Sequence, residues 1–167
     1  LKALHNDHEL RQSFPTMLIY GMYPEVLTAT TQQDKAFILQ ELTASYLLKD
    51  ILEIEKVKRS QLLTDLLILL AFQLGSEVSL NELANRLHID VKTVARYLDL
   101  LQKSYIIYNL RGLSRNLRSE VTRTSKYYFY DVGVRNALID NFNPLEKRDD
   151  VGGLWENFAV MERVKAL

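Results

Sequence analysis

Three observations predict a mainly α-helical fold, a helical bundle that contains a winged helix-turn-helix and a small β hairpin or sheet. Glycine and proline number only six and three among 167 residues, which favours long helices broken at a few points. Residues 79–103 carry two amphipathic patterns separated by a short turn, as in a helix-turn-helix. Two runs rich in aromatic and β-branched residues, 105–110 and 126–131, are typical of strands. With 47% hydrophobic residues, the chain can also bury a substantial core.

Residues 1–75 form the first predicted region, which is helical. Residues 1–14 show weak periodicity and predict a frayed helix or the remnant of a preceding segment. A turn is expected at 20–26, because Pro24 restricts the residue before it to extended conformations. Apolar residues then recur every three or four positions from 31 to 55, which predicts an amphipathic helix. A second helix over 60–74 is apolar on most sides, and Gly75 is suited to end it in the left-handed conformation.

The second predicted region, residues 76–135, begins with the helix-turn-helix. Ser79 and Glu82 have the spacing of a capping box, so a helix should begin there and run to about residue 88. Asp90 should cap the next helix, which continues to about Lys103. His88 lies in the turn where glycine is usual, and histidine tolerates the left-handed region better than branched residues do. The residues expected to pack where the two helices cross are Leu80, Leu83, Ala84, Leu87, Ile89, Val94, Leu98 and Leu101.

The outward residues of the second helix are candidate contacts to nucleic acid. In helix-turn-helix proteins the N-terminal residues of this helix face the base edges, which selects Lys92, Thr93 and Arg96. Asp90 and Asp99 oppose the two basic residues. A solvated face on a structural scaffold is therefore the alternative interpretation of the same pattern.

The segment between the two predicted strands would be the wing, and it is basic. Residues 101–130 hold six basic residues and the single acid Glu120, a net charge of +5, in a chain whose 21 basic and 21 acidic residues cancel. Such a cluster attracts phosphates and gives salt-dependent binding, which favours duplex DNA as a partner. An acidic surface of a neighbouring domain is the alternative partner. The six basic residues are Lys103, Arg111, Arg115, Arg118, Arg123 and Lys126.

The composition excludes several classes of protein and site. The chain has no cysteine, which rules out disulfides and thiolate metal sites and is typical of a reducing, cytoplasmic compartment. The most apolar run, residues 62–74, is too short for a membrane span and includes Asp65. None of the six glycines belongs to a P-loop pattern, so no ATP site of that kind is expected. We expect no metal site at Glu156 and Glu162 either, because the last helix offers no further ligand.

Residues 136–167 form the third predicted region, a linker followed by a helix. The run "VGVRNALI", residues 132–139, begins before position 136 and predicts a short helix. A polar loop follows it. An amphipathic pattern over 154–167 predicts the final helix. Because the chain begins without Met and stops inside this pattern, we expect it to be a fragment of a longer protein.

Several stretches together resemble the C-terminal region of a large family of bacterial and archaeal AAA-type ATPases. They are, in order, "LIYGMYPEV", "ELTASYLLKDI", "LNELANRLHIDVKTVARYLDLLQKSYII", "SRN", "KYYFYDVGVRNAL" and "LWENFAVMERV". In that family a P-loop ATPase module precedes a domain of unknown function that contains a winged helix and ends in a restriction-endonuclease-like segment. The resemblance covers the chain from about residue 17 to its end. The residues that match its motifs are Tyr23, Pro24, Asp50, Tyr97, Asp131, Gly133 and Glu156.

This resemblance implies a role beside an ATPase. It implies ATP and Mg²⁺ as ligands of a missing N-terminal module, none in this fragment, and that module as a partner. It also implies that the nuclease-like segment is present only as its first helix, 154–167. Our leading hypothesis is a non-enzymatic effector domain that contacts nucleic acid through the second helix and the wing. The rival hypothesis is a module that docks on the ATPase or forms a homo-oligomer, with the winged helix as a scaffold.

Overall fold

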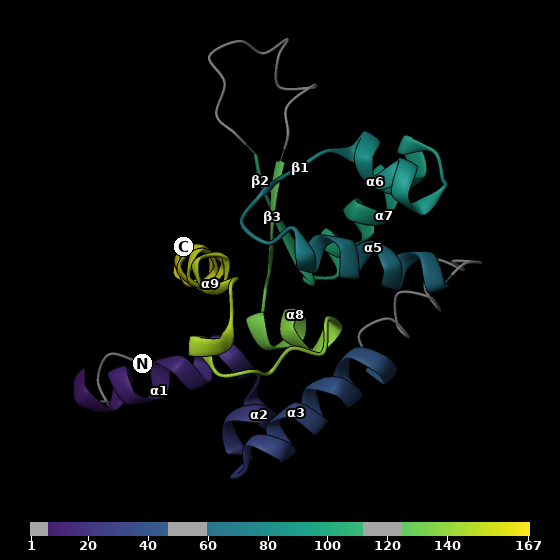
Figure 1. The fold of residues 1–167 in the computed structure, drawn as a ribbon. Helices are drawn as coiled ribbons and strands as arrows, with labels where there is room; N and C mark the ends of the chain where they lie inside the picture. The colour runs from purple at the N-terminus through teal and green to yellow at the C-terminus, as the bar shows by residue number, and fades with distance from the viewer. Residues whose placement is uncertain (1–6, 47–59, 112–124) are drawn as a thin grey trace.

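The computed structural model describes residues 7–46, 60–111 and 125–167. Over these residues the fold is mainly helical with one small three-stranded antiparallel sheet, which agrees with the predicted helical character and the predicted small sheet. Figure 1 shows helices α1, α2 and α3 at one end of the molecule and α5, α6 and α7 beside the sheet at the other end. Helix α8 lies between these two groups, and α9 lies on the far side of the sheet.

The N-terminal group consists of α1 (Asp7–Tyr20), α2 (Pro24–Thr28), α3 (Gln32–Glu41) and a π-helical turn, Leu42–Tyr46. Helix α1 extends beyond the weakly patterned residues 1–14, and the turn predicted over 20–26 is limited to three residues. Gly21 ends α1 with a φ of +71°, which costs glycine little. Pro24 then begins α2 at a position where its missing N–H is not needed. The helix predicted over 31–55 is described only as far as residue 46.

Helices α5 (Ser60–Phe72), α6 (Leu80–Leu87) and α7 (Val91–Lys103) form the second group. Ser79 accepts a hydrogen bond from the backbone N–H of Glu82, and Asp90 accepts one from the backbone N–H of Thr93. Both predicted N-caps are therefore confirmed. His88 adopts the left-handed conformation between α6 and α7, with a φ of 53°. The short turn predicted at this position is confirmed as well.

The sheet contains β1 (Glu77–Val78), β2 (Ile107–Arg111) and β3 (Ser125–Phe129), in the order β1-β3-β2. Strands β2 and β3 are antiparallel, with Ile107 opposite Phe129 and Arg111 opposite Ser125. Strand β1 pairs only with the first two residues of β3. The sequence predicts the two longer strands but not β1, because two residues are too few to show an alternating pattern.

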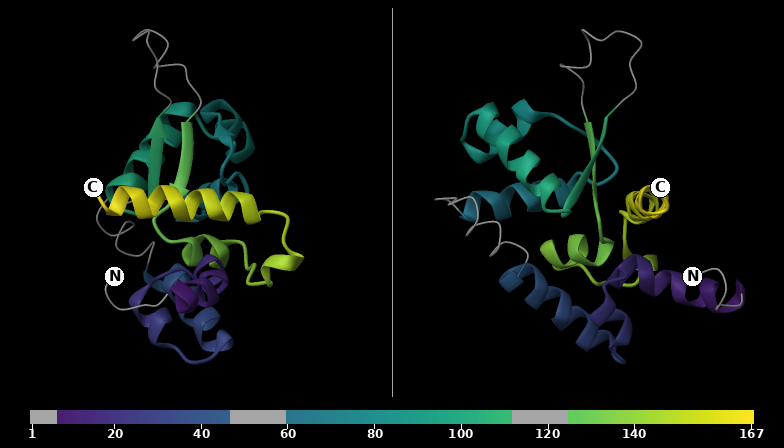
Figure 2. Two further views of the ribbon diagram at one scale, coloured as in Figure 1. Left: turned by 90° about the vertical axis from the view of Figure 1, so that its left-hand side faces the viewer. Right: turned by 180° about the vertical axis from the view of Figure 1, so that it is seen from behind.

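The two faces of the sheet pack against different helices. Side chains alternate along β3, so Tyr127 and Phe129 enter the core that α5, α6 and α7 share, whereas Tyr128 contacts α9 (Val151–Lys165). Both views in Figure 2 show α9 on the side of the sheet away from α6 and α7. Leu154 of α9 is nevertheless fully buried in the main core. The last helix is thus packed as part of the fold and covers one sheet face.

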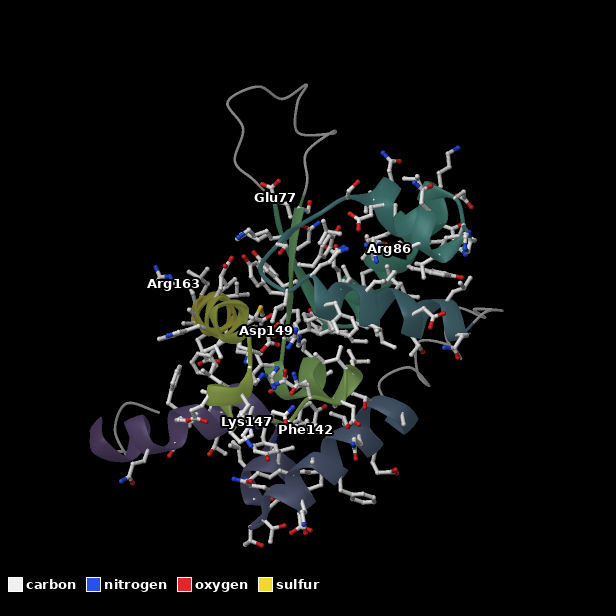
Figure 3. All side chains as sticks on the ribbon, viewed as in Figure 1. Glu77, Arg86, Phe142, Lys147, Asp149 and Arg163 are labelled. Carbon is white, nitrogen blue, oxygen red and sulfur yellow. The ribbon has the colours of Figure 1, made fainter. Side chains whose placement is uncertain are left out.

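Helix α8 (Val132–Leu138) connects the two helical groups. Asn136 is fully buried, and its side-chain amide donates to the carbonyl oxygens of Leu18 and Ile19 at 3.1 and 2.8 Å. A second core cluster joins α8 to α1, α2 and α3. Beside it Phe142, labelled in Figure 3, stacks on Tyr20 with ring centroids 5.6 Å apart. The sequence predicts α8 as a short helix but does not reveal that it is central.

The C-terminal region contains a short 3₁₀ helix, Leu145–Lys147, and α9. Helix α9 begins at Val151, three residues before the predicted start. The two glycines in its first turn have low helix propensity, which hides the start in the sequence. Among the described residues, no helix combines the length and apolar character that a membrane crossing needs.

Candidate nucleic-acid interface

Lys92 and Arg96 lie on the exposed side of α7, one helical turn apart. Within the described part of the chain neither side chain forms an ion pair. The guanidinium of Arg96 lies over the ring of Tyr97, 5.4 Å from its centroid, and Tyr97 itself is buried. Such a contact orients the Arg96 side chain and leaves its charge accessible. These two residues are therefore available for an external anion.

Thr93, the third predicted contact of α7, is engaged in capping the helix. Its hydroxyl donates to Oδ2 of Asp90 at 2.7 Å, and its backbone N–H donates to Oδ1 at 2.9 Å. These hydrogen bonds lower the pKa of the Asp90 carboxyl below its usual value. Asp90 therefore stays ionised at the N-terminus of α7, where negative charge is favourable. Its charge also opposes the approach of a phosphate to this end of the helix.

Lys103 lies at the opposite end of α7 and forms an ion pair with Asp99. The two charged atoms are 2.7 Å apart, and both side chains are more than half exposed. Exposed pairs at this helical spacing contribute little to stability, so a phosphate could replace the carboxylate. The exposed surface of α7 thus carries two basic residues without ion pairs and one paired with an acid.

The predicted wing lies largely outside the described residues. Arg111 is the last residue of β2, and the positions of Arg115, Arg118 and Arg123 fall between the described segments. The structure therefore leaves the +5 cluster of the sequence as a prediction. Lys126 is the exception, because it lies in β3 and its side chain is placed.

Lys126 turns toward α9, where it meets Glu156. The Lys126 ammonium lies 2.8 Å from Oε1 of Glu156, and the hydroxyl of Tyr128 donates to the same oxygen at 2.6 Å. Both hydrogen bonds lower the pKa of Glu156. Burial and the hydrogen bond to Glu156 raise the pKa of the Tyr128 hydroxyl. The charge of Lys126 is thus neutralised within the chain, on the sheet face opposite α7. Among the predicted phosphate-binding residues whose side chains are described, Lys126 is the least available.

Asn157, next to Glu156, makes a contact that the sequence does not reveal. Its side-chain Oδ1 accepts from the backbone N–H of Phe129 at 2.7 Å, and its Nδ2 donates to the Phe129 carbonyl at 2.8 Å. Strand β1 pairs only with residues 125 and 126, so the edge of β3 that faces β1 has no neighbouring strand at Phe129. The amide of Asn157 replaces a neighbouring strand there. The "EN" pair on α9 therefore attaches this helix to the sheet.

Asp131 and Gly133, two of the motif residues, hold the turn after α1. The Asp131 carboxylate accepts hydrogen bonds from the backbone N–H groups of Met22, Gly133 and Val134. Burial outweighs these bonds and raises the pKa of Asp131. A Cβ at Gly133 would lie 2.2 Å from the carbonyl oxygen of Tyr20, so no other residue fits. This motif has a structural explanation in the contact between α8 and α1.

A buried polar cluster beside α8 is also invisible in the sequence. The guanidinium of Arg135 donates to the Ala71 carbonyl at the end of α5, at 2.8 and 2.6 Å, and pairs with Asp150. Arg148 binds the same carboxylate at 2.7 Å and donates to Oδ1 of Asn136 at 2.9 Å. Arg135 is among the largest fully buried side chains of the described residues. Because its partners are up to 64 positions away, no local pattern predicts it.

The remaining motif residues that the structure describes, Tyr23, Pro24 and Tyr97, lie apart, at the start of α2 and in α7. Tyr23 and Pro24 lie at the start of α2, and Tyr97 belongs to the core beneath α7. Asp50 lies outside the described residues. Among the residues that are described, no three His, Cys, Asp or Glu side chains are close enough to hold a metal ion. What the site presents chemically is the pair Lys92 and Arg96 on α7, between the ionised Asp90 and the ion pair of Asp99 with Lys103.

Comparison with curated proteins identifies several uncharacterised bacterial relatives. One protein each of Mycobacterium bovis and Mycobacterium tuberculosis is 28% identical over 149 residues, which is 88% of this chain and 34% of the relative. A Haemophilus influenzae protein is 27% identical over 125 residues, 72% of this chain and 31% of its own length. The chain thus spans about a third of the length of these relatives. Their names state no activity and do not connect the chain to an ATPase.

No solved structure matches the chain. A family model does: the one described as "Domain of unknown function (DUF8612)" matches residues 11–145. The match extends from α1 through α8 and includes the α6–α7 pair and the whole sheet. Because it covers well over half of the chain, the protein belongs to this family of domains of unknown function.

Proposed function

We propose that residues 60–129 form a winged helix and contact duplex DNA through the N-terminal half of α7. The observation that carries this proposal is the pair Lys92 and Arg96, exposed, without ion pairs in the described chain and one turn apart at that end of α7. Side chains four residues apart lie on the same side of a helix, so both can reach one groove or one phosphate backbone. The domain supplies binding and no catalysis.

The topology supports the assignment of a winged helix. The elements follow one another as α5, β1, α6, α7, β2 and β3, and the strands are ordered β1-β3-β2. In a winged helix, the second helix of the turn motif is the one presented to DNA and the β2–β3 hairpin is the wing. The sequence between these two strands carries Arg115, Arg118 and Arg123, which would add phosphate contacts.

Titration of a fluorescein-labelled duplex at about 50 and about 200 mM salt tests this function. We expect binding at low salt that weakens steeply as salt rises. The double variant Lys92→Ala with Arg96→Ala should reduce the slope of log affinity against log salt by about 2, because each lost phosphate contact removes roughly 0.9. Alanine at Arg111, Arg115 and Arg118 should weaken binding further if the wing takes part.

The matched control removes two charges elsewhere. Lys147 and Arg163 are exposed, and Figure 3 shows both on the side of the molecule away from α6 and α7. The double variant with alanine at these positions changes the net charge by the same amount and should bind like the wild type. Absence of binding at low salt, or equal losses in both double variants, would contradict the proposal.

A second candidate function is protein docking or self-association through α2 and α3. Leu27 and Phe37 are 51% and 63% exposed there, at the end of the molecule opposite α6 and α7. A contiguous patch of exposed apolar side chains is typical of an interaction surface, and α2 and α3 supply two large ones. Analytical ultracentrifugation of the chain distinguishes this function: serine at both positions should dissociate an oligomer. A wild-type chain that stays monomeric alone and with the N-terminal part of a full-length relative excludes it.

We also propose that the domain works as the C-terminal part of a AAA-type ATPase, as the resemblance of its motifs implies. The curated relatives are about three times as long as the region matched here, which leaves room for such a module. The full-length Mycobacterium tuberculosis relative should then hydrolyse ATP in the presence of Mg²⁺. A purified, folded relative that neither binds nor hydrolyses ATP would refute this assignment and leave the DNA-binding proposal standing.

A further inference from the structure

Tyr105 is an exposed aromatic residue in a backbone conformation that does not favour it. It follows α7 directly, has a φ of 54° and is 72% exposed. Its N–H donates to the carbonyl of Gln102, and the N–H of Ile106 donates to that of Leu101. This is the hydrogen-bond pattern of a helix end at which glycine is the usual residue. Neither backbone preference nor burial explains a tyrosine here, which makes its exposed ring a candidate for contact with a ligand.

Two further tyrosines enlarge this aromatic surface. The rings of Tyr105 and Tyr130 lie 5.6 Å apart at 78°, and those of Tyr108 and Tyr130 lie 6.5 Å apart at 86°. Tyr130 is thus contacted edge to face by both neighbours, and burial together with the two other tyrosines raises the pKa of its hydroxyl. We call Tyr105, Tyr108 and Tyr130 the tyrosine platform. No other ring of the described residues packs on Tyr105, so much of its ring surface faces solvent.

Two lysines lie near the tyrosine platform, one by its position in the sequence and one by its position in a shared hollow. Lys103 lies two residues before Tyr105 at the end of α7, and Lys165 near the end of α9 lines the same hollow as Tyr130. Each is held in a surface ion pair, with Asp99 and Glu162. Exposed pairs of this kind are weak, so a phosphate can compete for either ammonium group. The platform therefore combines open ring surface with two nearby lysines, each paired with an acid that a phosphate can replace.

The platform is distant from the DNA contacts proposed for α7. Thirteen residues of α-helix span roughly 18 Å between the first and the last residue, so Tyr105 cannot reach the base pairs that Lys92 reaches. Bases within a duplex are also stacked on each other and do not offer their faces. A ligand of the platform must present planar groups that are free of such stacking.

We propose that the tyrosine platform stacks on unpaired nucleobases, so that the domain binds single-stranded nucleic acid at the end of α7 opposite Lys92. This proposal rests on the nucleic-acid-binding function proposed above and extends it to a second class of nucleic acid. Base stacking on aromatic side chains tolerates any sequence, since every base has an aromatic face, and nearby lysines bind the phosphates. Each ring ends in a hydroxyl, and the nearby charged side chains are the ion pairs of Lys103 with Asp99 and Lys165 with Glu162. These groups suit a polar ligand better than an apolar protein surface.

The variant Tyr105→Gly tests the proposal without weakening the backbone, because glycine suits this conformation. The probe is fluorescein-labelled (dT)12, measured by fluorescence anisotropy with the whole chain at about 50 mM salt. We expect Tyr105→Gly to lower affinity for (dT)12 at least ~5-fold, the lower limit for loss of one stacked base. Tyr105→Phe should keep most of the affinity, and duplex affinity should stay unchanged in both variants.

The matched control is His88→Gly. His88 is also exposed, also has a left-handed backbone and also ends a helix, and it lies outside the platform. It should bind (dT)12 like the wild type. The proposal is overturned if wild-type chain fails to bind (dT)12, if Tyr105→Gly binds it equally well, or if Tyr105→Gly changes only self-association, which would make the platform a protein contact. Loss of duplex binding alone would instead reject the function proposed for Lys92 and Arg96.

Discussion

Among the described residues, three other than glycine have positive φ angles, and each lies just after a helix: His88, Tyr105 and Asp140, at 53°, 54° and 48°. In each case the next residue donates its N–H back to a carbonyl five positions earlier, at 3.1, 3.1 and 2.9 Å. This bond satisfies a carbonyl that the helix leaves without a partner. The same helix-ending motif thus recurs three times among the described residues with a side chain that the conformation disfavours.

Glycine at position 88 should therefore stabilise the protein. His88 is exposed and its side chain makes no hydrogen bond within the described chain, so His88→Gly removes the left-handed strain and loses no contact. We expect the free energy of unfolding to rise by about 0.5–1 kcal/mol in urea denaturation. The control Ala95→Gly, on the exposed side of α7, should lower it by about 1 kcal/mol. A loss of stability in His88→Gly would contradict this account.

Asp150 links protein stability to pH. Burial alone would raise the pKa of this carboxyl, but Arg148 and Arg135 outweigh burial and lower the pKa from its ordinary value of 3.8 to about 2. A group whose pKa is lower in the folded state stabilises the fold above its unfolded pKa. That contribution should be lost as the pH falls from about 4 to about 2.

The effect is measured as the free energy of unfolding at pH values from roughly 5 to roughly 2, which bracket the two pKa values of Asp150. We expect a contribution on the order of 1 kcal/mol from Asp150, because solvent screens a partly exposed carboxylate. Asp149→Asn changes a neighbouring exposed carboxylate and should retain the dependence. Asp150→Asn should be less stable at neutral pH and show a flatter curve. An unchanged curve in Asp150→Asn would refute the assignment.

At the scale of elements, α9 is held by contacts that its own sequence does not indicate. A Cβ on Gly153 would lie 3.0 Å from the carbonyl oxygen of Leu74, so the first turn of α9 comes close to the end of α5. One turn later Glu156 binds Lys126, and Asn157 binds the backbone of Phe129. Glycine at the closest approach and polar side chains beyond it together define how α9 lies on the sheet.

Replacing Asn157 with leucine should detach this part of α9. The two side chains have similar size, but leucine would leave the N–H and the carbonyl of Phe129 buried without partners. We expect a loss of about 2–5 kcal/mol in urea denaturation, with an unchanged slope against urea. Glu162→Gln, farther along the same helix, should change stability by less than about 0.5 kcal/mol. A loss below about 1 kcal/mol in Asn157→Leu would show that the backbone of Phe129 finds other partners.

For the whole molecule, α8 and its buried charges connect the N-terminal helices to α5, α6, α7 and the sheet. Asn136 binds the end of α1, while Arg135 binds the end of α5 and the carboxylate that precedes α9. Two buried guanidinium groups share this carboxylate, and the Ala71 carbonyl at the negative end of α5 adds favourable electrostatics. We infer that the described regions unfold together. If one region separated from the others, a charged group of this cluster would become exposed or would lose its partner.

The variant Arg135→Met tests this coupling. In the wild type, helix content by circular dichroism and the fluorescence of Trp155, the single tryptophan, should report one thermal transition. Loss of the Arg135 contacts should lower the free energy of unfolding by roughly 3 kcal/mol. The transition seen by circular dichroism should then occur at a different temperature from the one seen by Trp155 fluorescence. The control Lys147→Ala, at an exposed position, should keep them coincident. Coincident transitions in Arg135→Met would mean that apolar packing alone couples the regions.

The sequence by itself determined the elements whose signals lie within a few residues. The caps at Ser79 and Asp90, the left-handed turn at His88 and the strands at 107–111 and 125–129 depend on neighbouring side chains and on alternation. The candidate contacts Lys92 and Arg96 also follow from helical spacing, and the structure places both in solvent. Family membership is equally a property of the sequence, since it rests on the match over residues 11–145.

Only the tertiary structure decided what the long-range polar side chains do. Asp131 binds Met22 across 109 positions, Asn157 binds Phe129 across 28, and Arg135 binds Ala71 across 64. The tertiary structure also places Lys126 beside Glu156 on the sheet face opposite α7, and it brings the rings of Tyr105 and Tyr130 into contact. The physical reason is that a buried polar group needs a partner at hydrogen-bonding distance, and packing alone brings residues so distant in sequence that close.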